Sequence, residues 1–344
     1  MSSHLHDDEE PDPAEVSAGV TDGHGHGHGN EHGHEHGHSD AAIDPPYVDE
    51  VSPGVFAYIQ PDGTWWINNT AFVVAGDGVV AIDTCATERR TRDFLATVAS
   101  VSGEPIRVLI NTHHHGDHTH GNYLTYPATI IGHEKCRELV IQSGVSHFPG
   151  IWEARDWGEL HIAPPMVTFS DRVDVWAGDL KLEVHYIGNP AHTTNDSVVW
   201  IPERGLLFTG DLVFNQGMPF VVMGSVSGSR LAIERLRSFG ASTLVPGHGP
   251  VCDSGILDSL DRYFAFVQAL ATEAVAANAS PIEAARSADM SEFAHLSDGE
   301  RLVGNLHRAM FEARGGMPGA VMDLVTVIGD MITFNGGRPL RCRV

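Results

Sequence analysis

The stretch THHHGDHTHGN, which begins at Thr112, holds five histidines and one aspartate. Alternate side chains of an extended segment point the same way, so His113 and His115 can reach one ion together. Asp117 and His118 follow the turn at the intervening glycine, so their side chains can reach a second position nearby. Neutral imidazole and carboxylate are the ligands that zinc and iron take in proteins. The spacing therefore predicts a metal site.

Three residues far along the chain have the chemistry to complete such a site. His192 lies in GNPAHTTND, Asp211 in LLFTGDLVF and His248 in LVPGHGPV. Each comes just past an apolar run, next to glycine or proline, and loops at strand ends are where sites usually lie. We therefore expect these three residues on loops that follow strands.

The elements around these residues read as two β-rich halves. In the first half, WWINNTAFVVAG, from Trp65, reads as a strand in which only one of the paired tryptophans can face inward. RVLIN, from Arg107, reads as a buried strand that runs into the histidine cluster. A second β series extends to His248, and helical runs flank both halves. This order predicts two sheets packed face to face with helices outside.

Five motifs occur in a recognisable order, namely AIDT, THHHGDH, PAHT, TGD and PGHG. Over roughly residues 50–255 the chain resembles the metallo-β-lactamase superfamily. The resemblance implies an α+β fold, a four-layer αββα sandwich with the metal site at one edge of the two sheets. A helical C-terminal extension would be added to that fold.

The resemblance also implies roles for individual residues. One metal would be held by three histidines and the other by an aspartate and two histidines: His113, His115 and His192, then Asp117, His118 and His248. Asp211 would bridge both metals, and Asp83 resembles the family's acid that supports the ligand loop. His114 and His120 fit no ligand position, so we expect them to have loop or supporting roles.

The chemistry implied is hydrolysis by two divalent metal ions. Zinc is the first candidate, although iron and manganese accept the same ligands. Two such ions would share a hydroxide as the nucleophile, and Asp117 is the candidate for proton transfer to the leaving group. An aspartate at position 211 resembles the glyoxalase II-like, lactonase-like and thioesterase-like branches, because true β-lactamases typically have cysteine there.

The expected substrate is an apolar small molecule with an ester, thioester, lactone or amide-type bond. Two alternatives within the same fold are a polyketide cyclase or thioesterase-like role and hydrolytic dehalogenation. A further alternative is a metal-buffering protein that acts through HGHGHGNEHGHEHGH, the run from His24 to His38. That run has many imidazoles but no rigid scaffold to hold them.

Composition divides the chain into three expected parts. Residues 1–45 are acidic, rich in histidine and almost free of large apolar side chains, which predicts a disordered tail. Residues 46–255 would form the catalytic domain. Residues 256–344 read as helices, which could form a cap over the site or the interface of a homo-oligomer.

Charge and cysteine content exclude several functions. The net charge of -24 argues against nucleic acid as a partner. The four cysteines form no CxxC pair, which argues against a zinc ribbon. There is no apolar run near the ~20 residues of a membrane span and no visible secretory signal. We therefore expect a cytoplasmic protein with a small-molecule substrate and no membrane partner.

Overall fold

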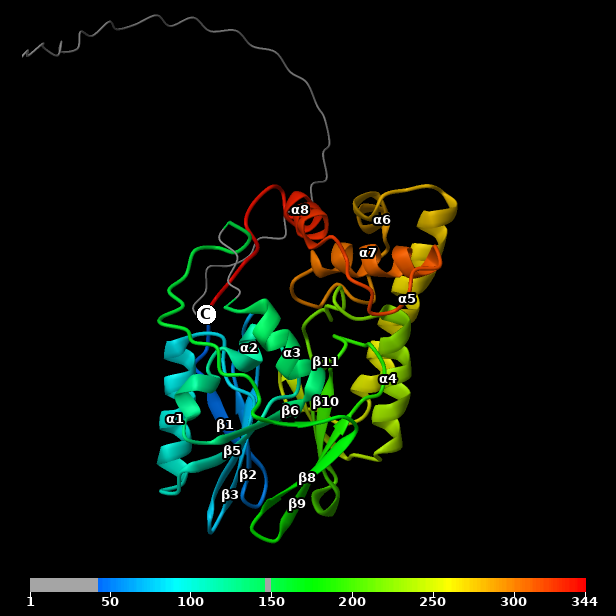
Figure 1. Cartoon of the computed structure of the whole chain (residues 1–344). Helices are drawn as coiled ribbons and strands as arrows, with labels where there is room; N and C mark the ends of the chain where they lie inside the picture. Colours follow the sequence, from blue (N-terminus) through cyan, green and yellow to red (C-terminus); the bar gives the residue numbers. More distant parts are fainter. Residues whose placement is uncertain (1–42, 146–149) are drawn as a thin grey trace, which may run out of the picture. The chain divides into compact units, whose positions relative to one another are not determined.

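The computed structural model describes residues 43–145 and 150–344. The histidine-rich run and nearly all of the expected tail lie outside the described residues. Residues from Ile43 to Val344 form one compact unit. Within the described ranges the chain folds into two sheets and eight α-helices (Figure 1).

The first sheet has seven strands in sequence order. Strands β1 to β4 pair antiparallel, whereas β4 to β7 run parallel. Every residue of β4 is buried, as expected for a strand covered on both faces. The bounds are β1 Tyr47–Ser52, β2 Val55–Ile59, β3 Thr70–Ala75, β4 Gly78–Ile82, β5 Ile106–Ile110, β6 Thr129–His133 and β7 Val167–Phe169.

The second sheet has five strands in the order β12-β11-β10-β9-β8. Its strands pair antiparallel except for β11 and β12, which are parallel. All nine residues of β11 are buried, so this strand runs through the interior. The bounds are β8 Arg172–Ala177, β9 Leu180–Tyr186, β10 Ser197–Ile201, β11 Leu206–Phe214 and β12 Thr243–His248.

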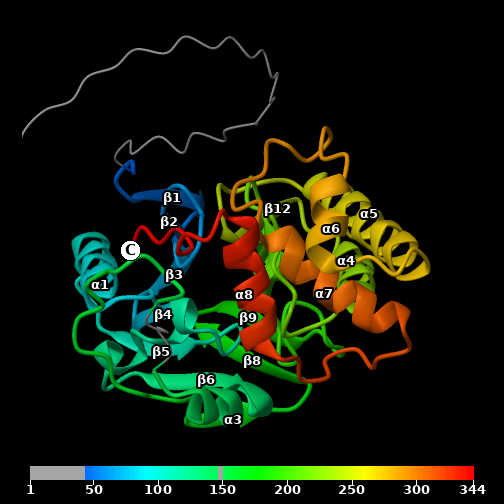
Figure 2. The same ribbon diagram turned by 90° about the horizontal axis from the view of Figure 1, so that it is seen from above.

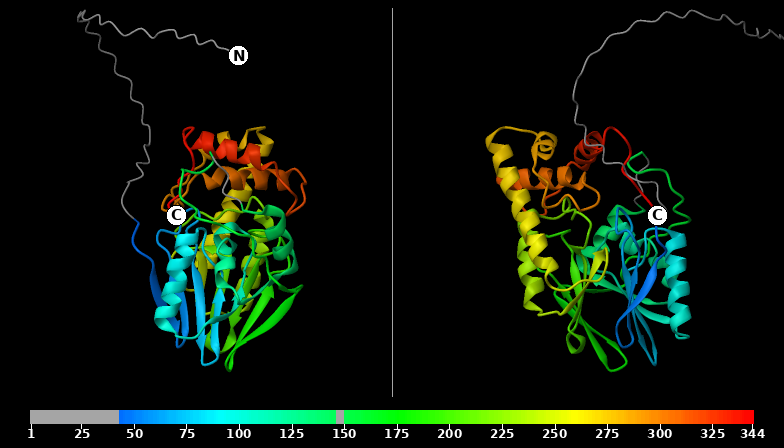
Figure 3. Two further views of the ribbon diagram at one scale, coloured as in Figure 1. Left: turned by 60° about the vertical axis from the view of Figure 1, so that its left-hand side comes forward. Right: turned by 180° about the vertical axis from the view of Figure 1, so that it is seen from behind.

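The two sheets pack face to face with helices outside, which confirms the predicted αββα sandwich (Figure 3). Apolar side chains from both sheets, such as Val80 and Leu182, form the core between them. Helix α1 (Glu88–Val101) packs Phe94 against the outer face of the first sheet. Helix α3 (Glu134–Ser143) contacts the same sheet, and α4 (Val226–Ser238) and α5 (Ile256–Ala276) cover the second.

Residues after Ala276 form three further helices: α6 (Pro281–Ser287), α7 (Arg301–Ala313) and α8 (Leu324–Phe334). The predicted C-terminal helices are therefore present. They lie at the end of the sandwich opposite the β8–β9 hairpin, and α8 is prominent when the molecule is seen from that end (Figures 1 and 2). None of the described helices combines the length and the apolar character that crossing a membrane requires.

The strand predicted from Trp65 begins only at Thr70. Trp66 has a backbone φ of 67°, which is incompatible with an extended strand. Trp65 and Trp66 also both pack on Trp152, so the expectation that only one tryptophan faces inward is wrong. The packing of both rings on a distant side chain, Trp152, overrides the local strand propensity here.

Asn69 joins the two sheets at the edge where the candidate site lies. Its Oδ1 accepts from the Gln60 amide at 3.2 Å, and its Nδ2 donates to the carbonyls of Pro246 and Gly249 at 2.9 and 2.6 Å. The side chain is buried. The backbone groups that it binds are shielded from water, so they would lose a hydrogen bond without it. The Asn69 amide therefore stabilises the contact between the sheets.

We predict that Asn69→Ala lowers the free energy of unfolding by about 2–4 kcal/mol, because it leaves buried backbone groups without partners. Chemical denaturation monitored by circular dichroism would measure the loss. Asn189→Ala is the matched control, since this half-buried amide also donates to two carbonyls, those of Pro190 and Gly228. Water can replace it there, and an equal loss in both variants would contradict the prediction.

Candidate metal centre

The histidine cluster follows the buried strand β5 and leads into a very short helix, α2 (Gly116–Thr119). His115 is the N-cap residue of α2, and Asp117 and His118 lie within it. His113 and His118 are fully buried, whereas part of Asp117 and of His115 reaches the surface. The cluster is thus held by β5 and opens to solvent on one side.

The three distant candidates come from the second sheet. His192 lies in the connection between β9 and β10, as predicted. Asp211 lies inside β11 and His248 is the last residue of β12, so the expectation that both lie on loops is wrong. The β11–β12 register shifts on both sides of Gly210, and this irregularity lets a strand residue point into the site.

Gly247 makes room for the Asp211 carboxylate. A Cβ at this position would lie 2.0 Å from Asp211 Oδ1 and 2.8 Å from the Asp211 nitrogen. Any larger residue would therefore displace the carboxylate. This close approach explains a glycine immediately before His248 in the PGHG motif.

The seven side chains form two groups that share Asp211. The ligand atoms within each group lie within 4.8 Å of one another: His113, His115, His192 and Asp211 in the first group, and Asp117, His118, Asp211 and His248 in the second. Asp211 Oδ2 is 3.4 Å from His192 Nε2 and 3.3 Å from His248 Nε2. Asp211 Oδ1 is 3.0 Å from His118 Nε2.

Unpartnered atoms inside the groups fit a cation. His113 Nε2, His118 Nε2 and Asp211 Oδ1 are buried and have no hydrogen-bond partner of good geometry, and the last two face each other at 3.0 Å. His192 Nε2 also faces His115 Nδ1 at 2.8 Å. His192 Nδ1 lies against the Phe220 carbonyl, so Nδ1 carries the hydrogen. In that tautomer Nε2 has a lone pair, which points toward His115. Buried polar atoms without partners are costly unless an ion or a proton joins them.

The outward nitrogen of every candidate histidine has its own partner, as expected for imidazoles whose other nitrogen binds a metal. His118 Nδ1 donates to Asp83 Oδ2 at 2.8 Å. His192 Nδ1 donates to the Phe220 carbonyl at 2.6 Å, and His248 Nδ1 to the Gly63 carbonyl at 3.1 Å. The remaining pairs are His113 Nδ1 with Thr112 Oγ1 and His115 Nε2 with Met223 Sδ.

Asp83, predicted to support the ligand loop, lies directly after β4 with a backbone φ of 59°. It accepts from the amide and hydroxyl of Thr112 at 2.8 and 2.6 Å as well as from His118. A non-glycine residue in this conformation is strained, and such strain is found at functional sites. The predicted contact between Asp83 and the ligand loop is therefore present.

The other supporting groups were not predicted. Thr112 was given no role although it begins the THHHGDH motif, Met223 lies in no motif, and the Phe220 and Gly63 groups are backbone carbonyls that any residue would have. Only Thr112 could have been noticed, because it precedes the first histidine. His114 and His120 belong to neither group: His114 accepts from Asn195, and His120 lies against the Ala86 carbonyl.

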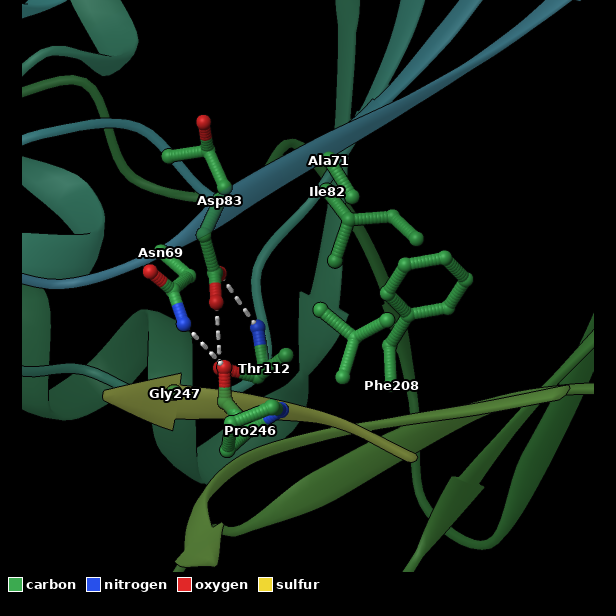
Figure 4. A pocket seen from close by; sticks show the side chains of 11 residues that line it. Asn69, Ala71, Ile82, Asp83, Thr112, Phe208, Pro246 and Gly247 are labelled. Carbon is green, nitrogen blue, oxygen red and sulfur yellow. Dashed lines mark hydrogen bonds between the residues drawn. The ribbon is translucent and has the colours of Figure 1, made fainter. Parts of the chain in front are cut away.

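A small cavity lies behind the ligands, between the two sheets. Asp83 and Thr112 line one side, and Phe208 and Pro246 line the other (Figure 4). None of the seven candidate ligands lines it. The cavity therefore belongs to the supporting structure and not to the face that a substrate would approach.

Charges within the site shift the pKa values of its members in opposite directions. Burial disfavours the charge on Asp211, but the imidazoles of His248, His118 and His192 outweigh burial and hold the Asp211 pKa well below its usual range. Burial lowers the pKa of His113 and His115, which are therefore neutral and can act as ligands.

The second group behaves differently when no metal is bound. Burial opposes a charge on His248, but Asp211 and Asp117 outweigh it and raise the His248 pKa to about 9. The pKa of His118 is likewise raised well above its usual value, because Asp211, Asp117 and Asp83 outweigh burial. Without a metal, protons balance the carboxylates at this group.

Comparisons with known proteins agree with this geometry. A family model described as the metallo-beta-lactamase superfamily matches residues 63–248. A Caenorhabditis elegans protein named beta-lactamase-like protein 2 homolog is 24% identical over 204 residues, which cover 58% of this chain and 62% of that protein. The hydroxyacylglutathione hydrolase of Rhodospirillum rubrum is 31% identical over 144 residues, or 42% and 48% of the two chains. The matches thus span less than two thirds of either relative.

A solved structure shares the fold. The metallo-beta-lactamase from Pontibacter korlensis aligns with a TM-score of 0.55 and 23% identity, over 64% of this chain and 99% of that one. Its alignment extends over nearly the whole of a known family member, and the family model spans every candidate ligand from His113 to His248. The chain therefore belongs to the metallo-β-lactamase superfamily.

Proposed function

We propose that this chain is a dinuclear hydrolase in which Asp211 bridges two divalent metal ions, with zinc the first candidate. The observation that carries the proposal is the sharing of Asp211 between two complete ligand groups. His113, His115 and His192 would hold one ion. Asp117, His118 and His248 would hold the other, and bound ions of this kind activate water and polarise a carbonyl at neutral pH.

The protein's own groups would orient these ligands and move one proton. Once metal ions replace the protons, the imidazoles would turn their lone pairs inward, because their outward nitrogens donate to Asp83, Gly63 and Phe220. Asp117 is the most exposed carboxylate of the ligand set, and its Oδ2 lies 3.2 Å from His248 Nε2. It would take up the proton that the attacking water releases and pass it to the leaving group as that group departs toward solvent.

The proposed substrate is an apolar small molecule with an ester, thioester, lactone or amide-type bond. A relative named as a hydrolase of hydroxyacylglutathione supports transfer of an acyl group to water. Phe214 stacks on His248 with ring centroids 4.9 Å apart but is buried, so it supports the ligand ring, and the apolar character of the substrate stays a prediction. Polyketide cyclase or thioesterase-like activity and hydrolytic dehalogenation would use the same ligand set.

The test is metal analysis of the purified protein combined with turnover on a panel of thioester, lactone, ester, β-lactam and aryl halide substrates. We expect about two ions per chain and metal-dependent hydrolysis of at least one acyl substrate. Exclusive turnover of an aryl halide would favour dehalogenation. A protein that binds two ions and hydrolyses nothing in the panel would contradict the proposed acyl hydrolysis.

We predict that Asp211→Asn abolishes binding of at least one ion and lowers turnover by about 100-fold or more, since even a supporting partner of a ligand is worth 10–100-fold. Metal analysis and steady-state kinetics would measure both effects. Asp174→Asn is the control, because Asp174 pairs with Arg172 on the outward side of the edge strand β8. Full turnover with two ions bound in Asp211→Asn would refute the bridging role.

We also predict that the metal-free protein loses stability as the pH rises from about 6.5 toward 9. A His248 pKa of about 9 in the folded state means that folded protein keeps a proton that unfolded protein releases. Stability from that proton is complete below pH ~6.5 and is lost as the pH passes the folded value.

Urea unfolding of chelator-treated and zinc-loaded samples across this range would measure the loss. Ionisation of cysteine thiols is common to both samples, so the difference isolates the imidazoles. In the zinc-loaded protein the imidazoles have no proton to lose, and its stability should fall less. Metal-free stability that stays constant or increases over this interval would show that these imidazoles are not protonated.

A further inference from the structure

Two candidate ligands depend on backbone carbonyls that lie outside helices and strands. His192 donates to Phe220, in the segment between β11 and α4, and His248 donates to Gly63, in a turn before β3. A ring held by one carbonyl turns if that carbonyl moves. The orientation of both imidazoles therefore depends on whatever holds these two segments in place.

Helix α7 holds the segment that contains Phe220. Asn305 accepts from the Val221 amide at 3.0 Å and donates to the Pro219 carbonyl at 2.8 Å. One amide side chain thus binds the peptide groups on both sides of Phe220. Because both bonds are buried, the Phe220 carbonyl has little freedom to rotate.

Two arginines of α7 extend this contact along the same segment. Arg301 donates to the Met218 carbonyl at 2.8 Å, and Arg308 donates through Nε to the Val222 carbonyl at 3.0 Å. Arg301, Asn305 and Arg308 are spaced by four and three residues, so they lie on one face of the helix. All three are among the most buried polar residues of the described chain.

The same helix also holds the turn that contains Gly63. The Arg301 guanidinium lies 4.0 Å from the centre of the Trp65 ring, and the Trp65 indole donates to Glu300 at 2.6 Å. Trp65 packs in turn on Phe220, with ring centroids 4.8 Å apart. The two segments that orient His192 and His248 therefore meet at one end of α7.

Burying a guanidinium group in a protein core carries a large desolvation penalty. Arg301 is paired with Asp298 at 2.7 Å, and Arg308 is bound by carbonyl oxygens of Val222 and Ala320. Apolar residues of similar volume often stabilise a protein as well or better. What the polar groups add is a defined position for the peptide groups they bind.

We propose that Arg301, Asn305 and Arg308 form a positioning element of the metal centre, so that the C-terminal extension sets the orientation of His192 and His248 from behind. The element does not touch the substrate. It acts through the carbonyls of Phe220 and Gly63. This inference rests on the proposed metal-binding function, because only a bound ion needs the two rings to be aligned.

The test measures metal binding directly, by titrating the metal-free full-length protein with cobalt(II) and following its visible absorption. We expect Asn305→Ala to weaken binding of one of the two ions by about 10–100-fold, as for other partners that orient ligands. The changed ion should be the one held with His192, and its absorption spectrum should shift. Arg301→Lys should weaken both ions, because it disturbs both segments.

Ser287→Ala is the control, since its part-buried hydroxyl also donates to a backbone carbonyl, that of Ala284, within helix α6 of the same C-terminal extension. It should leave cobalt binding and its spectrum unchanged. Arg301→Lys keeps the positive charge beside Asp298. It therefore provides a second test of the proposal if Asn305→Ala does not fold. A kcat/KM reduced through kcat, with KM little changed, would support the same role in the zinc-loaded enzyme.

The outcomes separate this inference from the proposed function. Variants that melt at lower temperature but bind both cobalt ions as tightly as the parent, with the same spectrum, would overturn the positioning role and leave α7 as a structural support. A parent protein that binds no cobalt at all would overturn the metal site itself. A parent that binds two ions without hydrolysing any substrate would overturn only the hydrolase proposal.

Discussion

One buried carboxylate is the constraint on which the site depends. Asp211 lies within 4.0 Å of imidazole nitrogens from four histidines: His113, His118, His192 and His248. An isolated charge in such a position would be very unfavourable, so it must be balanced by protons or by metal ions. The rest of the site can be understood as the means of bringing four imidazoles to this carboxylate while leaving Asp117 partly open to solvent.

The sandwich fold brings these side chains together because both sheets end at the same edge. Ligands come from the residues just after β5, from within β11 and from the end of β12, so both sheets contribute at one edge, and Asp83 and Asn69 lie just behind them. The helices after Ala276 then reach the same edge from outside. Support from the inner side is typical of a rigid scaffold for a site, and α7 adds support from the outer side through backbone carbonyls.

The predictions from sequence succeeded where local chemistry decides the outcome. The fold class, the superfamily and the C-terminal helices follow from hydrophobic patterns and ordered motifs. They failed where long-range contacts override propensity. Asp211 lies within a strand because β11 continues past a shift in register, and Trp65 and Trp66 lie in a turn where both rings pack on the distant Trp152.

The sequence by itself determined which atoms could bind metal. The chemistry of a ligand depends only on the side chain, and the spacing of neighbouring ligands can be read along the chain. It also determined the family, since five short motifs in one order are specific. Only the tertiary structure decided how the imidazoles are oriented. That depends on the carbonyls of Gly63 and Phe220 and on helix α7, whose contacts join residues up to 235 positions apart. A backbone carbonyl has no sequence signature, so its role appears only once the chain has folded around it.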